Sequence, residues 1–183
     1  MWSQESFLAA WNFAAEAHVG QMVPGSERAY INHVGSVAME VMAALGQRGD
    51  VFRPDLAIQC ALLHDVVEDS QVTIAAIEGT FGADVAAGVA ALTKDDSLAS
   101  KDAKMLDSLA RIKRQPHEVW MVKLADRITN LQQPPAHWRL DKVARYRQEA
   151  QLIHDELHDA CSVLGGRLAD KIANYRQYTD STS

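Results

Sequence analysis

The sequence predicts an all-α fold, and three observations carry that prediction. Apolar residues recur at helical spacing through nearly the whole chain, while the alternation typical of strands is almost absent. Hydrophobic residues make up 48% of the chain and charged residues 23%, which is ordinary for a folded globular protein. A chain of 183 residues can bury one full core, so we expect one domain over residues 1–178 and a disordered tail over residues 179–183.

The helical periodicity predicts a bundle of about eight to ten helices. The individual ranges follow from the apolar spacing and from start and stop signals. The predicted helices cover residues 4–18, 30–45, 54–67, 73–81, 83–92, 101–114, 118–131, 140–164 and 167–178.

Proline, glycine and capping residues set the boundaries along the chain. Residues 20–28, which contain Pro24-Gly25-Ser26, form the clearest loop. Pro54 suits a first helical turn, and Thr73 precedes the next helix as an N-cap. Residues 95–100 form a polar connection, and Pro134 ends the helix before it because proline disfavours helical geometry at the preceding residue. Gly165-Gly166 is interpreted as the stop of the helix over 140–164.

Composition excludes several classes of protein. Cys60 and Cys161 are far apart and lie in apolar helical surroundings, which favours reduced thiols and a cytoplasmic protein. The N-terminus lacks the features of a signal peptide, and no segment is apolar enough to span a membrane. A net charge of −6 disfavours a nucleic-acid surface, so we expect a small anionic ligand as partner. The oligomeric state, a homo-oligomer included, stays open.

The segment 57–69 begins as an apolar helix and ends in four ionisable residues, His64, Asp65, Glu68 and Asp69. At about 100° per residue, the four side chains fall within an arc of roughly 140° and could face one cavity. Three carboxylates so close repel one another, and a bound divalent metal would relieve that repulsion. The alternative is a solvated helix end with a capping histidine, because a His-Asp pair alone is weak evidence.

A second group lies on the helix over 118–131. Lys123, Asp126, Arg127 and Asn130 follow each other at i, i+3, i+4 and i+7, which makes one polar stripe on an otherwise apolar helix. An acid and an amide between two cations could hold a metal and an anion side by side. The alternative is a solvent-facing stripe with contacts inside the helix, each worth a few tenths of a kcal/mol.

A third element is the amphipathic helix over 30–45, where His33 lies away from the centre of the apolar face. Taken alone, such a histidine is more often a hydrogen-bonded residue at the edge of the core than a metal ligand.

Together the three elements resemble the HD-domain superfamily, whose metal is held by one histidine, a His-Asp pair and a distant aspartate. The matching positions are His33, His64, Asp65 and Asp126. The longer motifs Tyr-Ile-x-His-x3-Val-Ala, Ala-Leu-Leu-His-Asp-x-x-Glu-Asp and Val-Lys-Leu-Ala-Asp-Arg-x-x-Asn-Leu look like those of the alarmone hydrolases, the hydrolase half of RelA/SpoT enzymes and their stand-alone relatives. The order and spacing of the motifs agree over residues 9–164.

The resemblance implies an HD-type helical bundle that removes pyrophosphate from the ribose 3′ position of (p)ppGpp, with Mn²⁺ as the usual metal. It also implies that Glu68 and Asp69 are the catalytic acids. We expect hydrolysis alone, because the chain has no room for a synthetase domain. The substrate contacts that the resemblance implies are Lys123, Arg127, Asn130, Lys142 and Tyr146.

The chain departs from the family pattern in the loop before Tyr30. Members that act on guanosine alarmones usually carry Arg-Lys there, where this chain has Met22 and Val23. A thioether can still pack on a purine face, so we expect Met22 to contact the base and (p)ppApp to be a candidate substrate beside (p)ppGpp. Arg28 could compensate in part, and Ala29 replaces the usual proline.

Three other interpretations compete with this one. His154 and His158 have the i, i+4 spacing of a metalloprotease zinc pair, but Asp155 stands where that mechanism needs glutamate. An HD-type 5′-nucleotidase would use the same four ligands on nucleoside monophosphates. A catalytically weak HD module that senses nucleotides is disfavoured, because the ligands and acids are intact.

Overall fold

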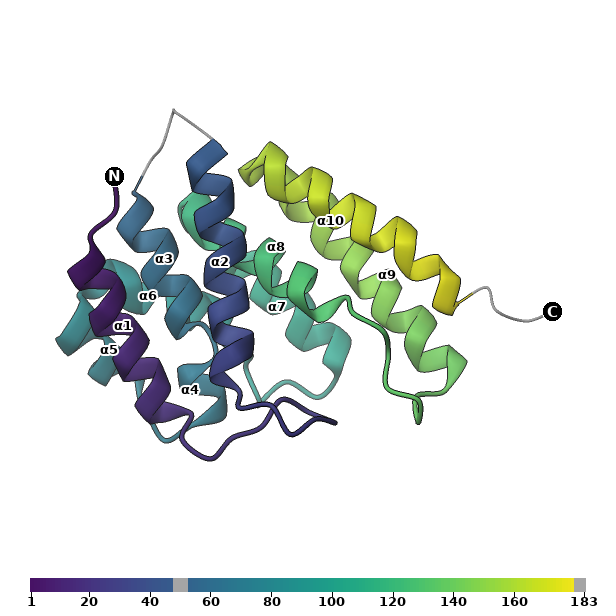
Figure 1. Ribbon diagram of the computed structural model, residues 1–183, viewed down its shortest axis with the longest axis horizontal. Coiled ribbons are helices and arrows are strands. Elements are labelled where there is room, and N and C mark those ends of the chain that lie inside the picture. The colour runs from purple at the N-terminus through teal and green to yellow at the C-terminus, as the bar shows by residue number, and fades with distance from the viewer. Residues whose placement is uncertain (48–52, 180–183) are drawn as a thin grey trace.

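The computed structural model describes residues 1–47 and 53–179, and these residues form an all-α structure (Figure 1). The described part contains ten α-helices and two short 3₁₀-helices, η1 and η2. The elements are α1 (Gln4–Ala17), α2 (Ile31–Gln47), α3 (Pro54–Leu63), α4 (Val66–Asp69), α5 (Ile74–Phe81), α6 (Ala83–Leu92), α7 (Lys101–Ile112), α8 (His117–Asn130), α9 (Leu140–Leu157), η1 (His158–Ala160), α10 (Ser162–Asn174) and η2 (Tyr175–Tyr178).

Most predicted helices are confirmed, with α6 at its predicted bounds. The predicted N-cap at Thr73 is confirmed as well, since the Thr73 hydroxyl accepts a hydrogen bond from the Ala76 N–H at 3.2 Å. The structure adds Ser100, which caps α7 in the same way. Pro54 begins α3, and α8 ends before the segment that contains Pro134. Of the predicted tail, residues 180–183 lie outside the described residues.

The prediction of one helix over residues 54–67 is wrong, because a turn at His64 and Asp65 separates α3 from α4. Asp65 has φ −104° and ψ −4°, and its carboxylate accepts a 2.6 Å hydrogen bond from the Tyr30 hydroxyl beside α2. The placement of His64, Asp65, Glu68 and Asp69 on one face of a single helix is therefore wrong too. His64 and Asp65 belong to the turn, and Glu68 and Asp69 belong to α4, the short helix that follows it.

The helix predicted over residues 140–164 is also wrong at its end. α9 stops at Leu157, Cys161 is extended at φ −158°, and Gly165 and Gly166 lie inside α10 rather than after a helix. A Cβ on Gly165 would lie 2.9 Å from the carbonyl oxygen of His158. This glycine therefore permits the close approach of α10 to η1, so it serves packing and is not the predicted stop signal.

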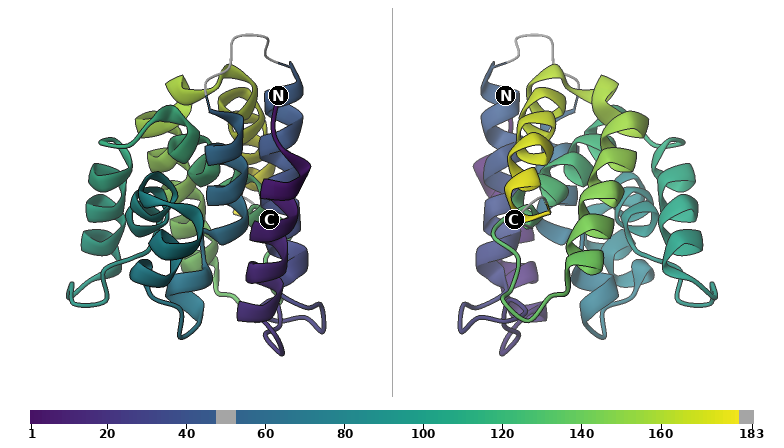
Figure 2. Two further views of the ribbon diagram at one scale, coloured as in Figure 1. Left: turned by 90° about the vertical axis from the view of Figure 1, so that its left-hand side faces the viewer. Right: turned by 90° about the vertical axis from the view of Figure 1, so that its right-hand side faces the viewer.

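The helices α3 and α8 form the centre of the bundle. α3 packs against α1, α2, α6 and α8, while α8 packs against α2, α3, α9 and α10. In Figure 1, α9 and α10 lie on the side of α8 away from α1, and Figure 2 shows α10 alongside α9. The end of α3 and the middle of α8 thus meet in the interior, where the predicted ligands lie.

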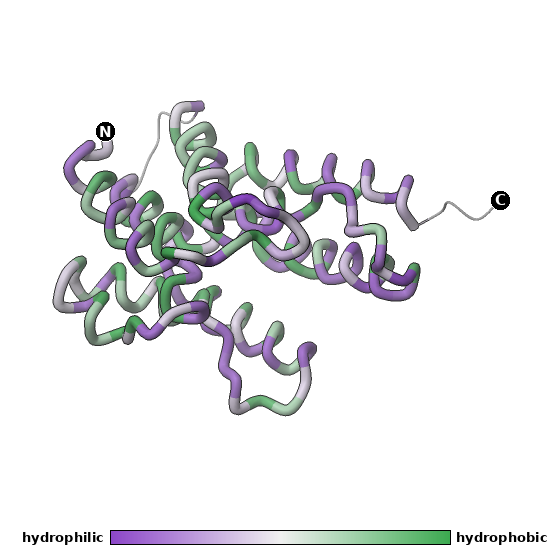
Figure 3. The backbone as a smooth tube through the Cα atoms, turned by 60° about the horizontal axis from the view of Figure 1, so that its bottom comes forward, coloured by the Kyte–Doolittle hydropathy of each residue, from purple (hydrophilic) through white to green (hydrophobic). Residues whose placement is uncertain are grey.

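Amphipathic helices build this core. Apolar and polar residues alternate along the helices in Figure 3, as the periodicity predicts. α3 is buried along most of its length, and a Cβ on Gly88 would lie 2.6 Å from the Cys60 sulfur, so α6 approaches α3 closely at this glycine. No helix in the described residues is both long and apolar enough to cross a membrane.

Candidate metal centre and substrate cavity

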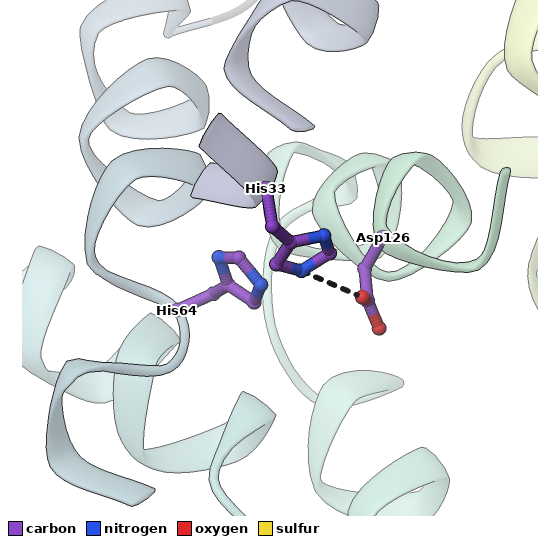
Figure 4. Close-up of side chains that lie close together, drawn as sticks. All are labelled: His33, His64 and Asp126. Carbon is purple, nitrogen blue, oxygen red and sulfur yellow. Dashed lines mark ion pairs between the residues drawn. The ribbon is translucent and has the colours of Figure 1, made fainter. Parts of the chain in front are cut away.

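His33 lies in the first turn of α2 and points toward α3 and α8. Its Nε2 atom is 3.5 Å from Asp126 Oδ1 and 3.7 Å from Asp65 Oδ2, and its side chain is 10% exposed. His33, His64 and Asp126 come from three different elements and point toward one another (Figure 4). The interpretation of His33 as an isolated residue at the edge of the core is therefore incomplete.

His64 follows the last residue of α3, and its ring orientation is fixed by the backbone. Nδ1 lies 2.8 Å from the Ala61 carbonyl oxygen, which can only accept, so Nδ1 carries the proton. Nε2 is buried and lies 3.0 Å from Asp65 Oδ2, with which it pairs when the ring is protonated. Once this nitrogen is deprotonated, a histidine held in this way can present it to a metal.

Asp65 and Asp126 carry the negative charge of the cluster. Burial works against ionisation of Asp126, but Lys123 and His33 outweigh it and hold the pKa of Asp126 well below its usual range. Burial likewise opposes ionisation of Asp65, yet His64 and His33 keep its pKa low. Both groups are therefore carboxylates at neutral pH.

The imidazole of His33 responds to these two carboxylates. Burial lowers the pKa of His33, but the hydrogen bonds to Asp126 and Asp65 outweigh burial and raise it to about 9. In the metal-free chain, protons therefore supply the positive charge that the carboxylates attract. A divalent cation would replace these protons.

The donor set fits a single metal ion. One ligand atom each from His33, His64 and Asp126 lies within 4.8 Å of the others, and Asp65 Oδ2 is close to both histidines. Ligands at about 2.1 Å from one metal are separated by about 3 Å or more, which matches these distances. Two imidazole nitrogens and two carboxylate oxygens suit a divalent transition metal. The four predicted ligands are thus brought together, and their role as ligands stays a prediction.

A cavity of about 430 Å³ opens beside this cluster, a size that suits a nucleotide. His64, Asp65 and Asp126 line its floor. The lining contains five cations beside six acids, so its balance of charge is less acidic than a metal cluster alone would give. The cavity-lining cations are Lys94, Lys101, Lys104, Lys123 and Arg127.

The polar stripe of α8 faces this cavity. Lys123 Nζ lies 3.3 Å from Asp126 Oδ2, and the Asn130 amide donates a hydrogen bond to Asp126. Lys123 and Arg127 are buried, so the interpretation of the stripe as solvent-facing is wrong for these two residues. The expected contact between Lys123 and Asp126 within the helix is present.

Arg127 is a buried cation with unused donors. Its guanidinium lies 4.5 Å from the centre of the Tyr146 ring and 3.7 Å from Glu149 Oε2. Nε and Nη1 have no hydrogen-bond partner among the described residues. An anion in the cavity would satisfy donors of this kind.

Glu68 and Asp69 lie on α4 at the edge of the cavity. Glu68 forms an ion pair with Lys94, and Asp69 accepts a hydrogen bond from the Gln21 side chain at 2.9 Å. Both predicted acids therefore share one space with the ligand cluster, while their catalytic role stays a prediction.

The remaining predicted residues are more dispersed. Tyr146 lines the cavity, whereas Met22 and Lys142 are not among the described residues that line it. Met22 is 52% exposed, and the Lys142 ammonium lies over the Trp138 ring at 3.9 Å. The substrate contacts expected of both stay predictions.

His154 and His158 stack on each other with ring centres 5.1 Å apart. Among the residues with described positions, the only group of three or more candidate ligands is the cluster of His33, His64 and Asp126. The zinc-protease interpretation gains no support from this helix.

Several cavity residues escaped the sequence interpretation. Tyr30, whose hydroxyl donates to Asp65, is the first residue of the Tyr-Ile-x-His motif, so the motif itself contained the signal. Lys94, Lys101 and Lys104 flank the polar connection 95–100, which was interpreted only as a loop. Glu149 carries no sequence signal that separates it from the other charged residues of α9.

Comparison with known proteins agrees with this geometry. The HD-domain family model matches residues 10–164. The chain is 36% identical to the guanosine-3′,5′-bis(diphosphate) 3′-pyrophosphohydrolase MESH1 of Xenopus tropicalis over 170 residues, which cover 88% of this chain and 89% of the relative. It is also 36% identical to the MESH1 protein of Danio rerio over 151 residues, which cover 80% and 81% of the two chains.

A solved structure of a metazoan orthologue of SpoT that hydrolyses ppGpp superposes with a TM-score of 0.80 at 26% identity. The match covers 95% of this chain and 97% of that one. The resemblance drawn from the motifs and the all-helical fold that it implied are both confirmed. The chain therefore belongs to the HD-domain family and, within it, to the 3′-pyrophosphohydrolase family of the MESH1 proteins.

Proposed function

We propose that this protein is a metal-dependent 3′-pyrophosphohydrolase of (p)ppNpp alarmones. The observation that carries the proposal is the largely buried cluster of His33, His64, Asp65 and Asp126, which opens into a cavity whose lining includes four lysines and Arg127. The MESH1 relatives are named as 3′-pyrophosphohydrolases of guanosine-3′,5′-bis(diphosphate), and the metazoan orthologue of SpoT is described as hydrolysing ppGpp. An acidic protein that concentrates lysines around an acidic metal cluster is suited to a small polyphosphate ligand.

The four clustered side chains would hold the metal, and Mn²⁺ is the ion we propose. When bound, it would lower the pKa of a water molecule and polarise the phosphorus that is attacked. Glu68 and Asp69 would orient the attacking water and accept its proton. Water adds to phosphorus, the bond between phosphorus and the ribose 3′ oxygen breaks, and that oxygen takes a proton. The products are pyrophosphate and a nucleotide with a free 3′ hydroxyl.

The cavity wall would bind the charged parts of the substrate. Lys123, Arg127 and Asn130 would contact phosphate or ribose, since Arg127 keeps two buried donors unpaired. Tyr146 would pack beside them under the guanidinium. Lys142 and Met22 would also contact the substrate, Met22 at the base.

For the base, we propose (p)ppGpp or (p)ppApp. The relatives are named for guanosine, whereas Met22 and Val23 replace the usual Arg-Lys pair and favour a change of preference. The buried, free thiols of Cys60 and Cys161 support a cytoplasmic setting for the reaction.

An assay with Mn²⁺ tests the function directly. The protein is incubated with ppGpp, ppApp or a nucleoside monophosphate, and pyrophosphate and phosphate are measured separately. We expect pyrophosphate from at least one alarmone and no phosphate from the monophosphates. Failure to release pyrophosphate from either alarmone would refute the proposal, and phosphate from monophosphates alone would favour the 5′-nucleotidase.

A further inference from the structure

The helix α4 holds both proposed catalytic acids on only four residues, Val66–Asp69. A helix of this length gains little stability from its own hydrogen bonds, so the directions of its side chains depend on other contacts. Glu68 and Asp69 each contact a residue from a different loop, Lys94 after α6 and Gln21 after α1. The proposed function assigns no role to either loop residue.

Lys94 contacts both oxygens of the Glu68 carboxylate. Its Nζ atom lies 2.5 Å from Oε1, and its backbone N–H donates to Oε2 at 3.2 Å. The preceding residue, Thr93, is anchored to α6 because its N–H and hydroxyl both donate to the Val89 carbonyl at 2.9 Å. Two contacts from one anchored residue fix the plane of the carboxylate as well as its position.

The opposite charges of Lys94 and Glu68 also favour this contact. Burial works against the positive charge of Lys94, but the hydrogen bond to Glu68 outweighs it and raises the pKa of Lys94. The side chain of Glu68 is 24% exposed and that of Lys94 is 43% exposed, so the pair lies at the mouth of the cavity.

Gln21 holds Asp69 from the opposite loop. Its Nε2 donates to Asp69 Oδ2 at 2.9 Å, while its Oε1 accepts from Nδ1 of the buried His18 at 2.7 Å. The Gln21 carbonyl also accepts the N–H of Tyr30 at 2.9 Å. The side-chain amide and the backbone carbonyl of Gln21 together therefore connect Asp69 to Tyr30, the residue before α2 and its His33.

We infer that Lys94 and Gln21 are positioning residues, which hold the carboxylates of Glu68 and Asp69 in the directions that hydrolysis requires. A carboxylate free to rotate beside a divalent cation can coordinate it and occupy the position of the attacking water. The two loop residues prevent this by engaging the carboxylates from the side. The inference rests on the proposed function, and it assigns both residues an effect on turnover rather than on binding.

A double-mutant cycle tests Lys94. K94M is expected to lower kcat about tenfold with KM within about twofold, and K94R is expected to restore most of the rate. In an E68Q background, K94M should change kcat by less than about twofold, because the group it positions is already disabled. The matched control is K113M. It breaks the exposed ion pair between Lys113 and Glu156, which are 2.7 Å apart and do not line the cavity, and it should leave kcat unchanged.

The same cycle applies to Gln21 and Asp69. Q21L is expected to lower kcat about threefold to tenfold, and D69N should remove that effect in the double variant. A rise in KM at constant kcat for K94M would mean that Lys94 only binds substrate, and additive losses in either cycle would overturn the inference.

Hydrogen exchange gives a readout that does not depend on activity. Exchange at the amides of residues 66–69 should increase in K94M and Q21L but not in K113M. An unchanged rate would overturn the positioning role. An inactive wild-type protein would instead refute the proposed function, while the exchange measurement still decides whether α4 is held by the two loops.

Discussion

Two regions of this chain contain the same His-Asp pair but differ in the exposure of that pair and in its neighbouring residues. His64-Asp65 and His158-Asp159 are both His-Asp pairs, with Nε2 to carboxylate distances of 3.0 and 3.2 Å. In both, Nδ1 lies near a backbone carbonyl earlier in the chain, Ala61 at 2.8 Å and His154 at 3.1 Å. The dipeptide alone therefore cannot explain which of them is a site.

The difference lies in exposure and in the partners that the fold supplies. The side chains of His64 and Asp65 are 4% and 20% exposed, whereas those of His158 and Asp159 are 47% and 83% exposed. His33 and Asp126 reach the first pair from α2 and α8. The proposed metal site therefore lies where segments distant in sequence converge, because α2 and α8 each contribute one proposed ligand and the turn after α3 contributes two.

The largest expected effect comes from removing a carboxylate of the first pair. Asp65→Ala should abolish Mn²⁺ binding and pyrophosphate release, because one ligand and the partner of two histidines disappear together. Asp159→Ala removes the equivalent atom from the second pair and should leave turnover unchanged. Calorimetric titration with Mn²⁺ and a pyrophosphate assay measure both variants, and a fully active Asp65→Ala would contradict the assignment.

The next largest effect tests whether Glu68, beside the first pair, is a general base or a metal ligand. Glu68→Ala should retain Mn²⁺ and lower kcat about a hundredfold to ten-thousandfold, the usual contribution of a general base. The assay is a comparison of Mn²⁺ stoichiometry with kcat for the same preparation. Loss of the metal in this variant would show that Glu68 is a ligand.

The pH dependence sharpens the comparison further. His33 has a pKa raised to about 9 in the metal-free chain, so a cation must displace a proton below that pH. Mn²⁺ affinity should rise by up to about tenfold per pH unit between pH 7 and 9 and then level off. By the same linkage, the stability that protonated His33 gives the metal-free fold is complete below about pH 6.5 and is lost as the pH rises through 9. An Mn²⁺ affinity that is flat over this range would contradict the account.

The smallest effect concerns the second region, where the backbone carbonyl of His158, and not its imidazole, affects the stability of the fold. Gly165→Ala places a Cβ 2.9 Å from the His158 carbonyl oxygen and should destabilise the protein by about 1–3 kcal/mol. Gly166→Ala, also inside α10, has open space at its Cβ and should stabilise by about 0.5–1 kcal/mol. Urea denaturation compares the two, and equal stabilities would mean that η1 shifts to accommodate the methyl group.

Sequence reasoning predicted the helices well where the periodicity and the caps were local. It failed at Asp65, where the helix break accompanies a contact with the distant Tyr30 hydroxyl, and at Cys161, where the break accompanies the tight approach of Gly165 to His158. The same limit applies to the site. Motifs pointed to the residues of the ligand cluster, whereas the contacts of Lys94 and Gln21 with α4 are visible only in the folded structure, where two loops lie beside this helix.

Mn²⁺ stoichiometry in matched histidine variants tests the central claim most directly. Wild-type protein and the His154→Ala/His158→Ala double variant should each bind one Mn²⁺ per chain in the metal cluster, and His64→Ala should bind none there. This outcome would locate the metal at the convergence of α2, α3 and α8. Retention of the ion by His64→Ala, or its loss from the double variant, would contradict the account.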